Sequence, residues 1–325
     1  MDFKDSLQLS VLDLTPIYRG ADAGTALQQS VLLAQTAERL GFTRYWVPEH
    51  HDMPELASSC PEVLLAHIGA RTETIRIGSG AVLLPHYKPY KVAEAFHLLA
   101  TLYPGRIDLG IGRAPGGSAH ATMALNDHFL EGVRQLPDSL QALSDLLRNE
   151  FMLDGQPVVA RPTPLEPPVL WLLGTNVKSA HYAAKLGVAY AFGQFMSDQV
   201  AEDVISAYKR EFQPSSMVRE PKVIVAVGVV CAATEAEAKL LAAEGAAWFR
   251  PRVADSVLEA EEAEAAFDRR TIVGNPPQVL EQLRQLQQHL GVDEFMIVTN
   301  IPDYAKRLRS YELIAGAVTG GTLTS

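Results

Sequence analysis

The sequence of 325 residues contains only two cysteines, Cys60 and Cys231, which lie far apart. This excludes a disulfide-stabilised scaffold, and the pair lacks the spacing of a zinc site. Long apolar runs are also absent, since the longest, residues 223–233, is well short of the roughly 18 residues that a membrane span needs. The N-terminus carries acidic residues where a secretory signal would have a basic segment. We therefore expect a cytoplasmic protein without a membrane anchor.

Basic residues are too few for general binding to nucleic acid. The chain has 28 Lys and Arg against 38 Asp and Glu, a formal net charge of −10, which opposes binding to polyanions and to anionic membranes. Hydrophobic residues make up 47% of the chain, enough for a substantial core, so overall disorder is excluded. The expected partners are small molecules, and one local basic pocket for a phosphate is compatible with this charge.

Short β-rich apolar runs alternate with longer amphipathic stretches, which is the pattern of a parallel sheet built from βα units. Strands are predicted over residues 7–14, 44–48, 75–84, 107–111, 169–173, 189–192, 223–230 and 294–299. Helices are predicted over residues 25–40, 62–71, 91–102, 129–149, 178–186, 198–212, 235–247, 277–290 and 303–315. This order favours an α/β fold of the (β/α)8 TIM barrel type, with a doubly wound open sheet as the alternative. No long linker or internal repeat divides the chain, so we expect a single domain over residues 1–325.

One segment interrupts the alternation. Residues 255–268 carry six acidic residues and no basic one, followed by Arg269 and Arg270. Like charges at helical spacing repel, so a helix here would be marginal by itself. Two interpretations stand: a solvated surface helix, or a mobile acidic lid over the barrel mouth, inserted near residues 250–270.

Three polar residues, Glu49, His50 and His51, directly follow the predicted strand 44–48. In a barrel, polar groups at the carboxyl end of a strand project into the active-site mouth. Simple capping of the loop is the alternative. A metal site is disfavoured, because adjacent histidines on an extended chain point to opposite faces and no other ligand motif lies nearby.

Glycines mark two strand candidates. Gly78 and Gly80 lie in the centre of the run 75–84, and glycine in a strand indicates a bulge or the close approach of another group to the backbone. A flat ring is one candidate for that group, and tight packing inside a narrow barrel is the other. The segment 106–117 ends its strand in a glycine-rich turn but lacks the G-x-G-x-x-G spacing of a dinucleotide site.

Residues suited to an anion follow two predicted strands. Arg113, after strand 107–111, can present its planar fork to a phosphate or be an ordinary surface arginine. Asn176 and Ser179 stand where strand 169–173 leads into a helix, whose first N–H groups attract anions. The same two side chains would serve equally as helix caps. The anion interpretation requires Arg113 to point to the same place.

These segments, in this order, resemble the luciferase-like monooxygenase superfamily, and in particular its bacterial luciferase-like oxidoreductases. The matching segments are residues 10–17, 38–54, 75–96, 104–117, 170–176 and 189–197. The resemblance implies a barrel that binds FMN with its ring deep in the mouth, often on a non-prolyl cis peptide, here Gly80–Ala81. It makes His50 the catalytic histidine, with Glu49 orienting groups around it. A histidine near its unperturbed pKa of about 6.5 is suited to proton transfer.

The resemblance also implies a phosphate site and an activity. The residues it assigns to the phosphate are Arg113, Asn176, Ser179 and, in a looser alignment, Arg134, and Gly174 is a further cofactor-binding residue. Thr175-Asn176 stands where light-emitting members have an acidic residue followed by serine, so light emission is not implied. The implied reaction is oxidation of a small organic substrate by reduced FMN and O2, with flavin supplied by a separate NAD(P)H-dependent flavin reductase. Many members of the family are homodimers.

Three alternatives belong to other functional classes. A deazaflavin (F420)-dependent oxidoreductase on the same barrel would transfer hydride instead of activating O2. A non-catalytic flavin-binding protein would hold the cofactor without turnover. A metal-dependent hydrolase is the third. The substrate is not specified by the sequence.

Overall fold

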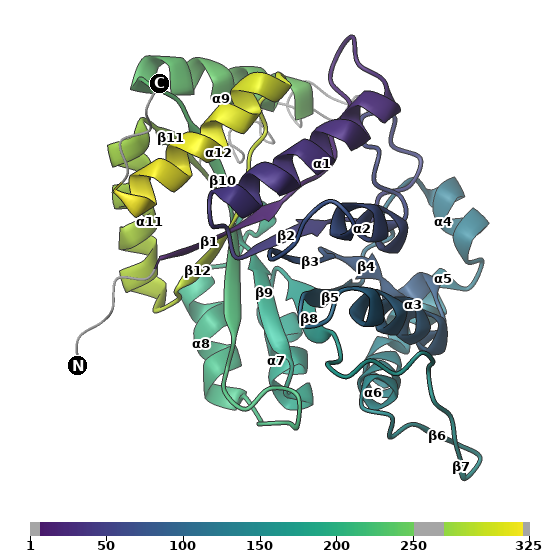
Figure 1. The fold of residues 1–325 in the computed structure, drawn as a ribbon. Helices are drawn as coiled ribbons and strands as arrows, with labels where there is room; N and C mark the ends of the chain where they lie inside the picture. The colour runs from purple at the N-terminus through teal and green to yellow at the C-terminus, as the bar shows by residue number, and fades with distance from the viewer. Residues whose placement is uncertain (1–6, 250–269, 321–325) are drawn as a thin grey trace.

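The computed structural model describes residues 7–249 and 270–320, so the acidic segment 255–268, interpreted as a surface helix or a lid, lies outside the described residues. Parallel strands close into an eight-membered barrel in the order β1-β2-β3-β5-β8-β9-β10-β12, and β12 pairs back to β1. Figure 1 shows the helices arranged around this barrel. The predicted (β/α)8 architecture is confirmed.

The elements have the following bounds. The barrel strands are β1 (Gln8–Leu12), β2 (Arg44–Val47), β3 (Arg76–Ser79), β5 (Ile107–Gly112), β8 (Val169–Gly174), β9 (Ala189–Gly193), β10 (Val223–Cys231) and β12 (Glu294–Val298). The helices are α1 (Ala23–Arg39), α2 (Pro61–Gly69), α3 (Pro89–Leu102), α4 (Ala119–Leu125), α5 (Phe129–Arg134), α6 (Leu136–Leu147), α7 (Val177–Leu186), α8 (Ala201–Glu211), α9 (Glu235–Phe249), α11 (Pro276–Leu290) and α12 (Tyr304–Thr319). Short elements complete the fold: β4 (Val82–Leu83), β6 (Met152–Leu153), β7 (Gln156–Pro157), β11 (Thr271–Gly274), η1 (Leu84–His86) and η2 (Gln194–Met196).

The helix predicted over residues 129–149 is wrong as a single element. It is divided into α5 and α6 at Gln135, and a proline stands in the first turn of α6. Proline has no N–H to donate and a fixed φ, so it favours the start of a helix over its interior. The strand β11, which pairs with β10 outside the closed ring, was not predicted either.

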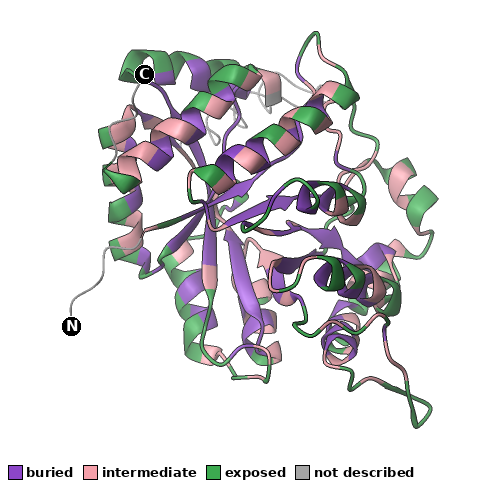
Figure 2. Ribbon diagram, in the orientation of Figure 1, coloured by how far each residue is buried: buried purple, intermediate pink, exposed green. Residues whose placement is uncertain are grey.

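Alternation along the strands separates two apolar layers. Odd-numbered residues of β2, such as Tyr45 and Val47, pack outward in the large cluster shared with the helices. Even-numbered Trp46 belongs to a smaller cluster inside the barrel, together with Trp171 and Met296. Figure 2 shows the strands buried and the outer faces of the helices exposed. The interior is therefore a packed core below the mouth and not a pore.

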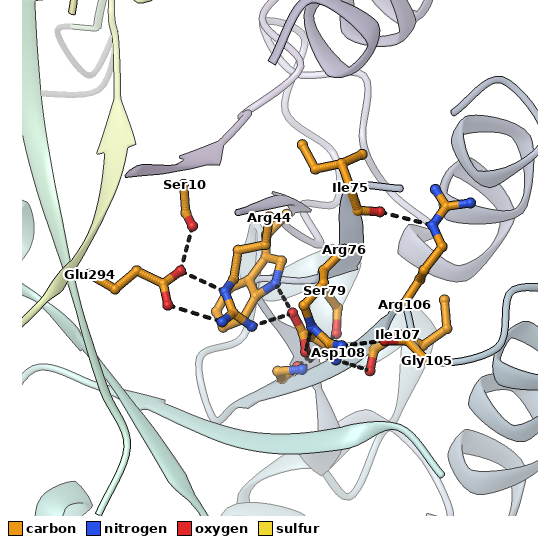
Figure 3. A network of polar contacts seen from close by, with 12 residues as sticks. Ser10, Arg44, Ile75, Arg76, Ser79, Gly105, Arg106, Ile107, Asp108 and Glu294 are labelled. Carbon is orange, nitrogen blue, oxygen red and sulfur yellow. Dashed lines mark hydrogen bonds and ion pairs between the residues drawn. The ribbon is translucent and has the colours of Figure 1, made fainter. Parts of the chain in front are cut away.

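Charged side chains close the amino end of the barrel (Figure 3). Arg44 lies 2.7 Å from a carboxylate oxygen of Asp108 and 2.6 Å from one of Glu294, and Arg76 lies 2.6 Å from Asp108. Burial by itself raises the pKa of Asp108, but the two arginines outweigh it and hold the pKa below its usual value. These ion pairs fill the amino end of the barrel interior.

Both ends of α11 carry capping signals. The Asn275 side chain accepts a hydrogen bond from the backbone of Gln278, whose side chain bonds back, and α11 ends at Gly291 in the left-handed conformation. None of the described helices is both long enough and apolar enough to cross a bilayer.

Candidate active site

Small residues occupy inward positions in the carboxyl half of the barrel. A Cβ atom at Gly80 would lie 3.0 Å from a methyl group of Leu12 and 3.2 Å from the ring of Trp46. A Cβ atom at Gly112 would lie 3.1 Å from that of Ala81. Side chains of Leu12 and Trp46 therefore pack closely against the side of Gly80 that a Cβ atom would occupy, and Ala81 does the same at Gly112. These contacts are those of the second interpretation of the glycines, tight packing inside a narrow barrel.

The peptide bond between Gly80 and Ala81 is cis, as the resemblance implied. The Gly80 N–H donates to the carbonyl of Val47 at 2.8 Å, which ties this bond to the end of β2. Ala81 is buried. The segment that would lie beneath a bound ring is thus joined to the segment that carries His50.

His50 follows β2 on the face that Arg44 and Trp46 share, because side chains alternate along an extended chain. Its Nδ1 atom is buried and has no hydrogen-bond partner. Burial and, to a lesser degree, the neighbouring His51 lower the pKa of His50 from 6.5 to about 4. The expectation of an ordinary pKa is therefore wrong: desolvation keeps this imidazole neutral at pH 7. It presents an unused hydrogen-bonding atom in the mouth.

The Glu49 carboxylate is buried beside His51 and not beside His50. One oxygen accepts a hydrogen bond from the Tyr87 hydroxyl at 2.6 Å and lies 2.8 Å from His51 Nε2. The other accepts the backbone N–H of Leu83 at 2.9 Å. Burial first, and then the bond to Glu49, raises the pKa of Tyr87, so this phenol stays a donor. Glu49 thereby fastens the end of β2 to β4.

The loops after β2 and β5 meet at the rim. The His51 N–H donates to the carbonyl of Gly116 at 2.8 Å, and His51 forms a parallel bridge with Gly117. A Cβ atom at Gly117 would lie 2.1 Å from the His51 carbonyl oxygen, so only glycine fits there. Tyr87 and these two glycines were not assigned to the site from the sequence.

The expected phosphate residues follow neighbouring strands, β5 and β8. Arg113 is exposed, and within the described parts of the chain it makes no hydrogen bond or ion pair. Residue Ile111 pairs with Leu172, so continuing that register places Arg113 opposite Gly174. A free guanidinium at this edge can reach an anion bound over the start of α7.

Asn176 and Ser179 are both engaged at the start of α7. The Asn176 side chain accepts the Ser179 N–H at 3.1 Å, and the Ser179 hydroxyl donates to the Asn176 carbonyl at 2.6 Å. A Cβ atom at Gly174 would lie 2.0 Å from the Ser179 hydroxyl oxygen, so glycine leaves room for that side chain. Within the described residues, no contact joins Arg134 to Arg113, Asn176 or Ser179. Arg134 is exposed on α5 and pairs with Glu131 at 3.5 Å.

Comparison with known proteins identifies the family. A family model described as "Luciferase-like monooxygenase" matches residues 7–294. The chain belongs to the luciferase-like monooxygenase family. The N-acetyl-S-alkylcysteine monooxygenase of Bacillus subtilis (strain 168) is 37% identical to it, over 96% of this chain and 98% of the relative. A luciferase-like monooxygenase of Escherichia coli (strain K12) is 33% identical, over 95% and 96% of the two chains.

Solved structures of luciferase-like proteins share the barrel. Apo-MsnO8 is 37% identical with a TM-score of 0.87 and covers 96% of this chain and 98% of its own. The FMN complex of the oxygenating constituent of 3,6-diketocamphane monooxygenase from Pseudomonas putida is 20% identical, with a TM-score of 0.74 over 98% and 100% of the chains. An F420-dependent secondary alcohol dehydrogenase is 17% identical, with a TM-score of 0.66 over 96% and 99%. At these lower identities the likeness concerns the fold alone.

No metal centre is found in residues 7–249 and 270–320, where no group of three or more His, Cys, Asp or Glu side chains could hold an ion. The adjacent histidines have separate surroundings: His51 contacts Glu49, and His50 Nδ1 contacts no polar group. The site of this luciferase-like protein is therefore described by its hydrogen-bonding groups and by the Gly80–Ala81 segment.

Proposed function

We propose that the protein is a monooxygenase that uses reduced FMN and O2 to oxidise a small organic substrate. Membership of the luciferase-like monooxygenase family gives the class of enzyme. One observation supports the finer assignment: a desolvated, neutral His50 with an unpartnered ring nitrogen follows β2, whose Val47 carbonyl accepts the N–H of Gly80 beside the Gly80–Ala81 cis peptide.

The residues of the mouth fit FMN. His50 Nδ1 is a buried polar atom without a partner, and a ligand in the mouth can complete it. Arg113 is free to meet a phosphate beside Gly174. When bound, FMN would supply the electrons that activate O2. Asn176 and Ser179 order the start of α7. The first backbone N–H groups of that helix would then contact the phosphate.

The protein itself contributes an apolar binding site from which water is excluded and in which the substrate is oriented. The inner cluster containing Leu12 and Trp46 packs against Gly80, and partly buried Leu56, Leu173 and Phe195 pack against the same cluster. Such a lining excludes water and favours a substrate with apolar parts. His50 would donate or accept one hydrogen bond there while remaining uncharged.

The substrate class to test first comes from the relative named N-acetyl-S-alkylcysteine monooxygenase. Thioethers of that type combine an apolar alkyl group with a readily oxidised sulfur atom.

Reduced flavin would come from an NAD(P)H-dependent flavin reductase, because no dinucleotide-binding fingerprint follows any strand in the sequence. We further propose a homodimer.

The test is a reconstituted reaction. Purified protein, FMN, NADH, a flavin reductase and isotopically labelled O2 are incubated with N-acetyl-S-alkylcysteines, and the products are analysed by mass spectrometry. The expected product contains one labelled oxygen atom, and His50→Gln lowers its rate by about a hundredfold or more. His128→Gln is the matched control, because the His128 side chain is exposed and its ion-pair partner is the exposed Asp127 at 3.8 Å.

The same preparation separates the proposal from its rivals. Binding of F420 without binding of FMN would replace the proposal with the hydride-transfer alternative. FMN binding with no oxygen incorporation into any substrate of the panel would favour a flavin carrier. Failure to bind either cofactor would contradict both flavin assignments.

A further inference from the structure

Glu49 differs from every other buried acid in the described part of the chain. The others are Asp13, Asp108 and Glu294, and each of them pairs with at least one arginine. The side chain of Glu49 is 1% exposed, yet its partners are a phenol, a backbone N–H and the imidazole of His51. A buried carboxylate requires compensation by charge or by strong hydrogen bonds. His51 is the only partner in this set that can carry a positive charge.

His51 is held rigidly at the boundary between the site and solvent. Its side chain is 13% exposed, its Nε2 atom lies 2.8 Å from Glu49, and its backbone is fixed to Gly116 and Gly117. The ring of His86 lies 6.1 Å away, centroid to centroid. An imidazole in this position can exchange a proton with water on one side while the carboxylate holds the other side of its ring.

The proposed reaction requires a proton from solvent. With S as the substrate, FMNH⁻ + O2 + S + H⁺ gives FMN + SO + H2O, so that the flavin is oxidised by two electrons and one oxygen atom leaves as water. His50 is poorly placed to hold this proton in reserve, because a charge on it would have no hydrogen-bond acceptor at Nδ1. The adjacent residue, His51, has such an acceptor in the carboxylate of Glu49.

We propose that His51 is the residue through which the mouth takes up this proton, and that His50 acts beside it as a neutral hydrogen-bonding group. Glu49 and Tyr87 are positioning residues that hold the His51 ring. The inference rests on the proposed monooxygenase function. It divides between two adjacent histidines the roles that the sequence assigned to His50 alone.

Other titratable groups face this cluster and must be accounted for in any pH profile. They are His50, His86, Cys60 and Glu62. Each of them stays unchanged in His51→Gln, so a change in that variant can be assigned to His51. Tyr87→Phe removes one hydrogen bond to Glu49 and leaves both histidines in place.

The first experiment needs no cofactor. The full-length protein, labelled with ¹⁵N in its histidine rings, is observed by NMR at neutral pH. We expect a slowly exchanging ring proton on His51 Nε2, shifted downfield by its bond to the carboxylate, that disappears in Glu49→Gln and persists in His50→Gln. Circular dichroism establishes that each variant is folded, and Tyr87→Phe replaces Glu49→Gln if the latter does not fold. Absence of this proton from the folded wild-type protein would overturn the proposal.

The second experiment uses FMN and O2 as the only reactants. Reduced FMN bound to the protein is mixed with O2 over a range of pH, and the return of oxidised flavin absorbance is followed, in the reaction FMNH⁻ + O2 + H⁺ to FMN + H2O2. We expect His51→Gln to flatten the pH profile and to slow reoxidation at neutral pH by about tenfold or more. We expect His50→Gln to change the rate but to keep the shape of the profile. His128→Gln should match the wild type in both respects.

The outcomes distinguish the two proposals. A wild-type protein that binds no FMN contradicts the proposed function, while the NMR result still reports on the His51–Glu49 contact. A protein that binds FMN, and in which His51→Gln keeps the wild-type pH profile, overturns the role of His51 and leaves the monooxygenase function in place.

Discussion

Acidification should destabilise the protein through His50. Unfolded, this imidazole has its ordinary pKa of 6.5, and burial lowers the pKa in the folded protein to about 4. Between these values the unfolded chain binds a proton that the folded protein does not. The contribution of neutral His50 to the free energy of unfolding is therefore fully present above pH 6.5 and is lost as the pH falls towards 4. The difference of about 2.5 between the two pKa values corresponds to ~3 kcal/mol.

The assay compares the wild type with His50→Gln, which cannot titrate. Urea unfolding is measured at pH values of about 7.5 and 4.5, by fluorescence and by circular dichroism, to establish that the transitions coincide. Between these two pH values the wild type should lose ~2–3 kcal/mol more than the variant, since other titrating groups are common to both proteins. Equal losses in the two proteins, or an NMR midpoint for His50 near 6.5, would refute the desolvation of this side chain.

Three further predictions concern the barrel floor, the ring site and the phosphate site. Asp108→Asn leaves Arg44 and Arg76 without their shared carboxylate, so the free energy of unfolding measured in urea should fall by ~3–5 kcal/mol. The control, Glu312→Gln, removes a surface ion pair and should lower it by at most about 1 kcal/mol. Similar losses in both variants would refute the role of the network. Gly112→Val should weaken FMN binding by about tenfold or more in a fluorescence titration. The control, Gly24→Ala, whose Cβ atom would meet only Asp22 at 3.6 Å, should bind FMN like the wild type. Normal FMN binding by Gly112→Val would show that the end of β5 does not contact the flavin ring. Arg113→Ala should weaken binding of FMN by about 10- to 100-fold but leave binding of riboflavin unchanged; an equal effect on both ligands would show that Arg113 does not contact the phosphate.

The eight barrel strands could be predicted because each one repeats a local signal. A β-rich run ends in polar or glycine residues, and an amphipathic helix follows. The break at Gln135 was missed because residues 129–149 keep an apolar periodicity across it, although Pro137 marks the start of α6. The strand β11 was missed because its four residues follow the acidic segment and pair with the far end of β10, a contact that no local pattern reports.

The ion-pair floor illustrates a signal that was present and not used. Arg44, Arg76 and Glu294 each stand at the first position of a strand, and Asp108 stands at the second. A charged residue at the start of several apolar strands indicates inward-facing charges that must meet at one end of a closed barrel. Their pairing still depends on closure, since Arg44 and Glu294 are 250 positions apart.

The active-site residues were found more easily than their roles. Glu49 and His50 were recognised by their position after β2, but the contact of Glu49 with His51 depends on Tyr87 and Leu83, which come from the next βα unit. Likewise, the pKa of His50 depends on its burial, which a sequence position does not give. Arg134 matched a family pattern loosely, and the structure places it in an exposed pair with Glu131.

The most direct test of the account is a crystal structure of the protein soaked with FMN. The account predicts a ring lying on the Gly80–Ala81 segment within hydrogen-bond distance of His50 Nδ1, and a phosphate between Arg113 and the start of α7. Flavin bound outside the carboxyl end of the barrel, for example in the roughly 570 Å³ cavity lined by Leu147, Pro168 and Met217, would contradict it.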